Sequence, residues 1–267
     1  MEGRDGLPQD VDRISAHRNW LSRRTDQHGA WRCGRGVLIA EEFLLLCFDD
    51  QTGKKIISSD KIEPALGGAL LVELALKERI GVTAESAGWR QRGRFTVTDT
   101  TSTDDLELDS ALAKLQAAEG KKIKDLISKM SGKRITKGLE RRLLERLAAT
   151  GVLRLERGKV LGIFPRTMWP TSDMGPEEDV RERLQTALIA GLTPTEHTVA
   201  LIGLLEATGL LTKVVPSEDK KSLRRRAKEL TEGDWTARAV TQAIEEVTAA
   251  AAAAASAAAS AGAHGGS

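Results

Sequence analysis

The 267-residue chain has little of what metal sites, disulfide scaffolds and active sites need. Its two cysteines, Cys33 and Cys47, have a spacing that matches neither a zinc knuckle nor a CxxC redox pair, which argues against a disulfide framework and suits a reducing compartment. The four histidines are scattered, and none has a second ligand at the i, i+4 spacing of a helical zinc site. We therefore expect no metal, no cofactor and no enzymatic activity.

Long apolar runs are also missing. The longest, Ala65 to Leu76, is interrupted by Glu73 and is shorter than the ~20 residues that cross a bilayer. The first residues are mostly polar and charged, without the apolar core of a signal peptide, so we expect a cytoplasmic protein. The formal charge of +2 is too small to indicate a nucleic-acid partner, and none is expected.

The most informative segment that is present runs from Ala40 to Ile80. It joins an acidic-headed apolar helix to a polar turn and a second helix, which carries Gly67 and Gly68 and is apolar on almost every side. Helices that are apolar all round are buried in a larger bundle. The predicted fold is therefore mainly α, a compact helical bundle around a buried central helix, with one protruding β-hairpin. Glu73, a lone carboxylate in that helix, is expected in a structural ion pair, with a functional acid as the alternative.

Other patterns place the remaining elements. Repeated leucines at every fourth residue from Ile135 to Leu147, followed by Gly151, predict a helix with a left-handed C-terminal cap. Apolar stretches on either side of Arg157 and Gly158 predict the hairpin, within Gly151–Pro165. The further predictions are a short strand within Trp89–Thr98, a helix opening at Pro176, a helix Glu196–Ala207 with a capping-box-like start at Thr193 and closed by Gly209, and helices at Asp109–Ala118, Lys121–Met130, Ser217–Leu230 and Asp234–Val247.

Composition divides the chain into three parts. Residues 1–36 form an Arg-rich arm, interpreted either as a solvated leader or as a flexible segment that binds an anionic surface or a partner. Residues 37–247 form the helical domain. Residues 248–267 are an Ala-rich tail, disordered or frayed, with high helix propensity and no core to dock on.

Basic residues gather in two clusters, from Lys121 to Arg146 and from Lys220 to Lys228. If the first cluster shares a face with the Val152–Phe164 hairpin, that face combines cations with exposed apolar groups, as peripheral proteins do on anionic lipid. The alternative is a solvated helix face whose long stems cover the edges of the core.

Several blocks carry a family resemblance. They are EEFLLLCFDDQTGK, ALGGALLVELALKERI, ERRLLERLAATGVL, LGIFPRTMWP, ALIGLLEATGLL and RRRAKELTEGDW, spread in order from about Leu38 to Val247. With these blocks the chain resembles the Golgi phosphoprotein 3 family, especially its shorter relatives in high-GC, actinobacterial-type bacteria. The abundance of Ala and Arg and the absence of Tyr also suit a bacterial source. The resemblance implies a helical bundle with a β-hairpin and a non-enzymatic peripheral membrane adaptor that binds phosphatidylinositol 4-phosphate.

The resemblance also indicates where a lipid headgroup would bind. The family's headgroup positions fall at Ser58, Gly67, Lys137 and Glu140, of which Lys137 keeps the basic character. Neighbouring cations can rebuild such a site, so the candidate headgroup-binding residues are Lys133, Arg134, Lys137 and Arg141. The candidate hairpin residues for membrane insertion or self-association are Val160, Leu161 and Ile163.

Two functions follow from these expectations. The first is a cytoplasmic adaptor, reversibly peripheral on the cytosolic face of a membrane, whose partners are an anionic phospholipid with a phosphoinositide-like headgroup and an unknown protein. The second is a protein interaction or self-assembly module that has lost phosphoinositide binding, with a homo-oligomer formed through the hairpin.

Overall fold

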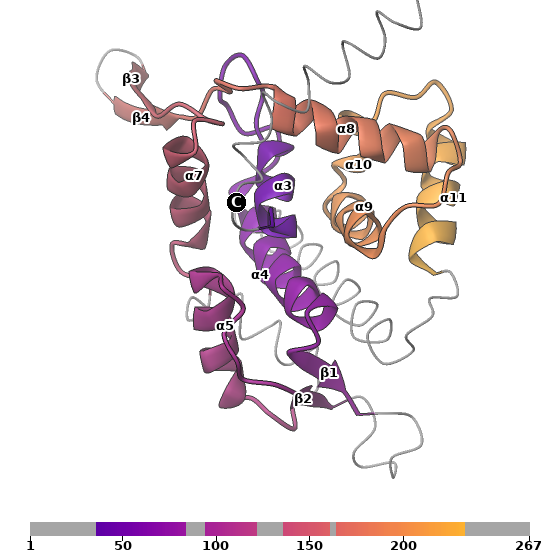
Figure 1. The fold of residues 1–267 in the computed structure, drawn as a ribbon. Coiled ribbons are helices and arrows are strands. Elements are labelled where there is room, and N and C mark those ends of the chain that lie inside the picture. The colour runs from indigo at the N-terminus through magenta and orange to yellow at the C-terminus, as the bar shows by residue number, and fades with distance from the viewer. Residues whose placement is uncertain (1–35, 84–93, 122–135, 161–163, 233–267) are drawn as a thin grey trace, which may run out of the picture. The chain divides into compact units, whose positions relative to one another are not determined.

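The computed structural model describes residues 36–83, 94–121, 136–160 and 164–232 (Figure 1). The chain divides into two units, residues 1–36 and 37–267, and all of the described helices and strands lie in the second. These elements are α3 (Ile39–Leu45), α4 (Ser59–Leu76), β1 (Ile80–Val82), β2 (Phe95–Val97), α5 (Leu106–Gln116), α7 (Leu139–Ala149), β3 (Glu156–Val160), β4 (Phe164–Met168), α8 (Gly175–Leu188), α9 (Glu196–Thr208), α10 (Leu211–Val214) and α11 (Lys220–Thr231). The mainly α fold class is thereby confirmed.

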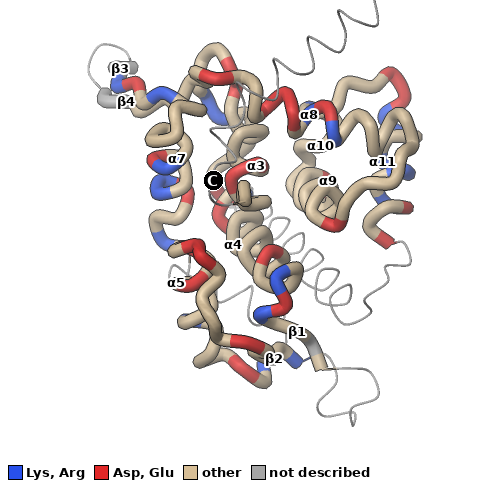
Figure 2. Tube along the Cα trace, in the orientation of Figure 1, with Lys and Arg blue, Asp and Glu red and all other residues tan. Residues whose placement is uncertain are grey.

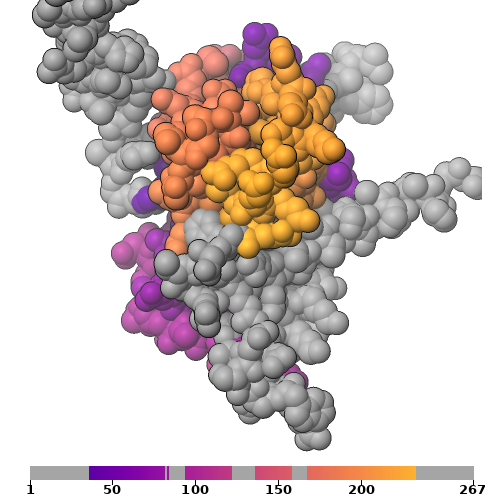
Figure 3. Space-filling model, turned by 90° about the vertical axis from the view of Figure 1, so that its right-hand side faces the viewer, coloured from indigo at the N-terminus to yellow at the C-terminus, as the bar shows by residue number. Residues whose placement is uncertain are grey.

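The central helix is α4. All of its residues from Pro64 to Ala75 are buried, because α4 packs against α3, α5, α7 and α9 on its different sides. The second layer forms around α9, which also contacts α8, α10 and α11. Leu223 and Ala227 are the buried residues of α11, which lies beside α8 and α9 (Figure 3). The prediction of a helix apolar on all sides at the centre of the bundle is confirmed.

Glu73 has a different partner from the one expected. Its carboxylate is 7% exposed and accepts a hydrogen bond of 3.0 Å from the backbone N–H of Ile39, the first residue of α3. Among the described residues, therefore, this buried acid holds a helix N-terminus rather than a cation, and the ion-pair prediction is wrong. A helix N-terminus carries partial positive charge, so it can take the place of a basic side chain. Burial raises the pKa of Glu73.

The two acids of α3 point to different helices. Glu41, 1% exposed, pairs with Arg146 of α7 at 2.8 Å, and the same guanidinium binds Asp105, the N-cap of α5, at 2.8 Å. Glu42, 4% exposed, binds Arg183 of α8 at 2.6 Å. Adjacent carboxylates on a helix diverge, as expected, and here each one ties α3 to a different neighbour.

His197 of α9 is the second partner of Glu42, with 2.9 Å between Nε2 and Oε2. Burial acts to lower the pKa of His197, but the hydrogen bond and charge of Glu42 outweigh it and raise that pKa. Burial likewise acts to raise the pKa of Glu42, but His197 and Arg183 lower it. His197 is therefore the partner of a buried carboxylate and links α9 to α3.

Two small antiparallel sheets accompany the helices. β3 pairs with β4 with Val160 opposite Phe164, so Arg157 and Gly158 lie inside β3, and the predicted turn position is wrong by several residues. Apolar residues continue past Gly158 in the sequence, and β3 extends to Val160 among them. β1 pairs with β2 in a second antiparallel pair. β2 confirms the short strand predicted within Trp89–Thr98, whereas its three-residue partner β1 was not predicted.

The base of the β3–β4 hairpin is attached to the α3–α4 connection. The Trp169 N–H donates to Gly53 O at 3.4 Å and the Thr171 N–H donates to Asp50 O at 3.2 Å. Gly53 has φ +58°, and a Cβ there would lie 2.5 Å from Pro170 N. Glycine is therefore required at this position both by the backbone conformation and by the close approach of the two segments.

Helix ends follow the predicted signals in most cases. Gly151 and Gly209 have φ +80° and +74° after α7 and α9, and Pro176 lies in the first turn of α8. The cap of α9 is a correction, because Thr195 rather than Thr193 accepts the hydrogen bond from the Thr198 N–H. Four predicted segments fall on residues that the structure does not describe, apart from residues 36 and 121 at their edges. They are the basic arm 1–36, the helices 121–130 and 234–247, and the Ala-rich tail 248–267.

Candidate functional site

Two of the four predicted headgroup residues can be placed. Lys137 lies in the turn before α7, next to Gly138 with φ +70°, and Arg141 lies in the first turn and a half of that helix. Both side chains are exposed, and Arg141, 72% exposed, pairs with Glu145 at 3.0 Å. Lys133 and Arg134 lie outside the described residues.

Other members of the first basic cluster are used inside the fold. Arg142 binds both carboxylate oxygens of Glu107 on α5 at 2.7 and 2.8 Å, which raises its pKa, and Arg146 is held by α3 and α5 as described above. Figure 2 accordingly shows acidic and basic positions interspersed along α7 and its neighbours. The cluster is therefore divided between exposed cations at the start of α7 and cations that link helices.

The positions indicated by the family resemblance lie on two elements, Ser58 and Gly67 at the start of and within α4, and Lys137 and Glu140 at the start of α7. Gly67 is buried within α4, so no cation is presented there. Glu140 is neutralised by Lys55, at 2.7 Å. Ser58 is exposed at the N-cap of α4, and its side chain makes no capping hydrogen bond. Of these positions, Ser58 lines a pocket.

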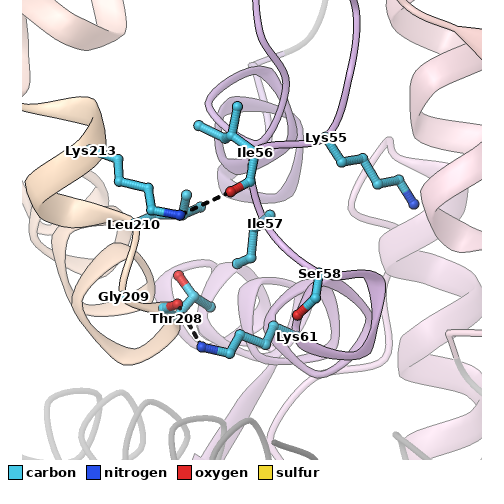
Figure 4. Close-up of a pocket in the computed structure, with 9 residues that line it drawn as sticks. All are labelled: Lys55, Ile56, Ile57, Ser58, Lys61, Thr208, Gly209, Leu210 and Lys213. Atoms are coloured by element: carbon cyan, nitrogen blue, oxygen red, sulfur yellow. Dashed lines mark hydrogen bonds between the residues drawn. The ribbon is translucent and has the colours of Figure 1, made fainter.

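That pocket, of about 450 Å³, lies between the N-terminal end of α4 and the α9–α10 corner (Figure 4). Two lysines reach across it in opposite directions: Lys61 of α4 donates to Thr208 O at 3.3 Å, and Lys213 of α10 donates to Ile56 O at 3.1 Å. Its lining residues are Lys55, Ile56, Ile57, Ser58, Lys61, Thr208, Gly209, Leu210 and Lys213. We call this space the lysine pocket.

Sequence reasoning missed the lysine pocket. Lys61 and Lys213 belong to neither basic cluster and are separated by some 150 positions, so only the packing of α4 on α9 and α10 brings them together. A weak local signal was present, since Lys54, Lys55 and Lys61 flank a Ser-rich helix start, which is a common setting for anions.

The predicted hairpin residues are only partly placed. Val160 is the last residue of β3, and Leu161 and Ile163 lie outside the described residues. At the base of the hairpin, two apolar side chains are well exposed, Leu155 at 43% and Met174 at 51%. The described part of the hairpin region therefore presents apolar groups to solvent, next to Arg154 and Arg157, which are also exposed.

Within the described ranges, no group of three or more His, Cys, Asp or Glu side chains is arranged to hold a metal ion. No helix there is long and apolar enough to cross a membrane. Cys47 is fully buried, and burial raises the pKa of its thiol.

The described residues form a mainly helical bundle in which a β-hairpin follows the cation-bearing helix α7. The family model for Golgi phosphoprotein 3 (GPP34) matches residues 39–247, and the chain belongs to this family. It is also similar to vacuolar protein sorting-associated protein 74 of Eremothecium gossypii, with 28% identity over 226 residues that cover 73% of this chain and 67% of that protein. The family resemblance of the sequence blocks is thereby confirmed.

Proposed function

We propose that this chain is a non-enzymatic peripheral membrane adaptor that docks reversibly on the cytosolic face of a membrane. Lys133, Arg134, Lys137 and Arg141 bind anionic phospholipid, with a phosphoinositide-like headgroup as the preferred ligand. The hairpin tip is buried at a shallow depth in the bilayer. The observation that carries the proposal is membership of the Golgi phosphoprotein 3 family together with the exposure of Lys137 and Arg141.

The relation between α7 and the hairpin supports a single docking surface. Lys137 precedes α7 and the hairpin follows it, so the 11 residues of α7 separate them by about 16 Å at about 1.5 Å per residue. A membrane plane parallel to the axis of α7 touches both ends of the helix. We propose that the cations and the hairpin tip face this one plane and act together.

The energetics suit reversible binding. A basic residue near an anionic surface contributes about 1 kcal/mol, so the four candidate cations together supply about 4 kcal/mol, or roughly a thousandfold in partitioning. Shallow burial of a few apolar side chains adds to this. Such attraction falls steeply with salt, because exposed charges are screened over about 10 Å at 0.1 M.

Liposome flotation tests the proposal. Wild-type protein is expected to float with vesicles containing phosphatidylserine or phosphatidylinositol 4-phosphate at low ionic strength, and not with phosphatidylcholine alone. Lys137→Gln with Arg141→Gln removes about 2 kcal/mol and weakens partitioning about 30-fold. Arg225→Gln with Lys228→Gln, which removes the same charge from exposed positions of α11, is the matched control. Equal binding of all three proteins, or none by the wild type, refutes the proposal.

A specific observation also favours the second function, an interaction or self-assembly module without phosphoinositide binding. Gly67 is buried and Glu140 is acidic at positions where the family resemblance implies cations. Val160→Asp with Leu161→Asp separates the two functions. Loss of vesicle binding alone supports membrane docking, whereas a fall in sedimentation mass with no effect on vesicles supports self-assembly. If neither changes, the hairpin has no role in either function.

A further inference from the structure

We propose that the lysine pocket is a second anion site, which takes the dianionic phosphate group of a phosphomonoester or a pyrophosphate. Its cations differ from the predicted headgroup set, Lys133, Arg134, Lys137 and Arg141, although Ser58, which lines the pocket, is one of the positions that the family resemblance indicates. The inference rests on the cavity, on the two lysines that cross it and on the balance of charge around them.

The two lysines retain donors for a ligand. An ammonium group has three N–H donors, and hydrogen bonds within the described residues use one at Lys61, to Thr208 O, and one at Lys213, to Ile56 O. A carbonyl acceptor orients an ammonium but does not neutralise its charge. Lysines that approach from opposite walls can therefore bind one anion between them without leaving their carbonyl partners (Figure 4).

The charge around the pocket is not balanced by acids. Three of the nine described residues that line it are lysines, and no carboxylate is among these nine. Lys55 is neutralised by Glu140 at 2.7 Å, which leaves the charges of Lys61 and Lys213. Asp60 and Glu63 lie nearby on α4, outside the lining, and Asp60 is exposed to solvent. A doubly charged anion matches two ammonium groups.

The pocket also offers space and a neutral donor. Small-molecule sites enclose about 300–1,000 Å³, and the lysine pocket, at about 450 Å³, falls within that range. The Ser58 hydroxyl lines it and makes no capping hydrogen bond. A phosphate that lies there also faces the positive end of the α4 dipole, which adds to the attraction of the lysines.

The competing interpretation is that both lysines only fasten α4 to the α9–α10 corner. In that case, removal of the lysines lowers stability and no ligand responds. A binding measurement on the folded variants separates the two interpretations. Lys213→Gln alone serves if the double variant does not fold, because Lys213 is exposed and contributes a single described hydrogen bond.

The experiment uses the full chain and two probes, sodium pyrophosphate in a calorimetric titration and phosphatidic acid in phosphatidylcholine vesicles. In a background that carries Lys137→Gln and Arg141→Gln, which weakens vesicle binding through the docking surface, we expect Lys61→Gln with Lys213→Gln to weaken binding of both probes at least tenfold. Lys61→Arg with Lys213→Arg should retain it. The control, Lys114→Gln with Lys228→Gln, removes the same charge from exposed positions on α5 and α11 and should bind as the wild type does.

The outcomes identify the source of the phosphate. Displacement of the protein from phosphatidic acid vesicles by pyrophosphate points to a lipid headgroup, and pyrophosphate binding without vesicle binding points to a soluble phosphorylated ligand. Saturable binding that is equal in the wild type and the Lys61/Lys213 variant, or no binding of either probe by the wild type, overturns the inference. Failure here is distinct from failure of membrane docking, because phosphatidylserine vesicles test Lys137 and Arg141 separately.

Discussion

Arg146 joins three helices, and its removal should be among the most damaging single changes in the charged network of the bundle. Its guanidinium binds Glu41 of α3 and the α5 cap Asp105, both at 2.8 Å. These acids are 1% and 6% exposed, whereas the Arg146 side chain is 22% exposed. Arg146→Met keeps most of the side-chain volume and removes only the charge and the donors.

The expected loss can be worked out from this burial. Removal of one partner from a buried ion pair costs about 3–5 kcal/mol, because the remaining charge stays desolvated. A domain has about 5–15 kcal/mol of total stability, so the variant loses a large part of its free energy of unfolding. With a urea slope of about 2 kcal/mol per M, the unfolding midpoint should fall by about 1.5–2.5 M with no change in slope.

The control is Arg141→Met on the same helix. Arg141 is 72% exposed and its ion pair with Glu145 is solvated, so the same chemical change should cost less than about 0.5 kcal/mol. Circular dichroism in urea measures both variants. If Arg146→Met lowers the midpoint no further than Arg141→Met, the network does not stabilise the fold and the argument from burial fails.

Two more changes test the fold. Gly53→Ala combines a left-handed backbone with a Cβ that would lie 2.5 Å from Pro170 N, so it should cost about 2–5 kcal/mol of unfolding free energy. The control, Gly120→Ala, has φ +77° but no atom near its Cβ, and should cost about 1 kcal/mol. Equal urea midpoints for the two variants would contradict this reasoning. Burial, followed by the hydrogen bond with Asp50, raises the pKa of Glu177 from 4.5 to about 7. The folded protein thus holds a proton that the unfolded chain has lost, so this residue makes stability fall as pH rises from about 4.5 to about 7. Glu177→Gln should remove that part of the fall in urea midpoints measured at pH 5 and pH 7.5, and an unchanged pH dependence would show that Glu177 is ionised throughout.

Much of the fold could be predicted from the sequence because its signals are local. The buried α4 follows from an apolar run with no polar face, and the ends of α7 and α9 follow from glycines that adopt left-handed conformations. The signals that failed were weak or ambiguous. The missed strand β1 has only three residues, and two threonines competed for the α9 cap.

The site was less accessible to sequence reasoning because its charges are arranged by tertiary packing. A basic cluster in the sequence does not reveal that Arg142 and Arg146 point to α5 and α3 while Lys137 and Arg141 face solvent. Nor does it reveal that Lys61 and Lys213 meet at one pocket. Glu73 shows the same limit of sequence reasoning, because the group that donates a hydrogen bond to its carboxylate is the backbone N–H of Ile39 at the N-terminus of α3.

The attachment of the hairpin has a mechanical consequence. Its base is joined to the α3–α4 connection by main-chain bonds between residues 50–53 and 169–171. A pull on the strands is therefore transmitted from backbone to backbone into the centre of the bundle, without passing through side chains that can rotate away. The β3–β4 ribbon should act as a stiff lever, and a load applied at its far end would be felt first where α3 turns toward α4.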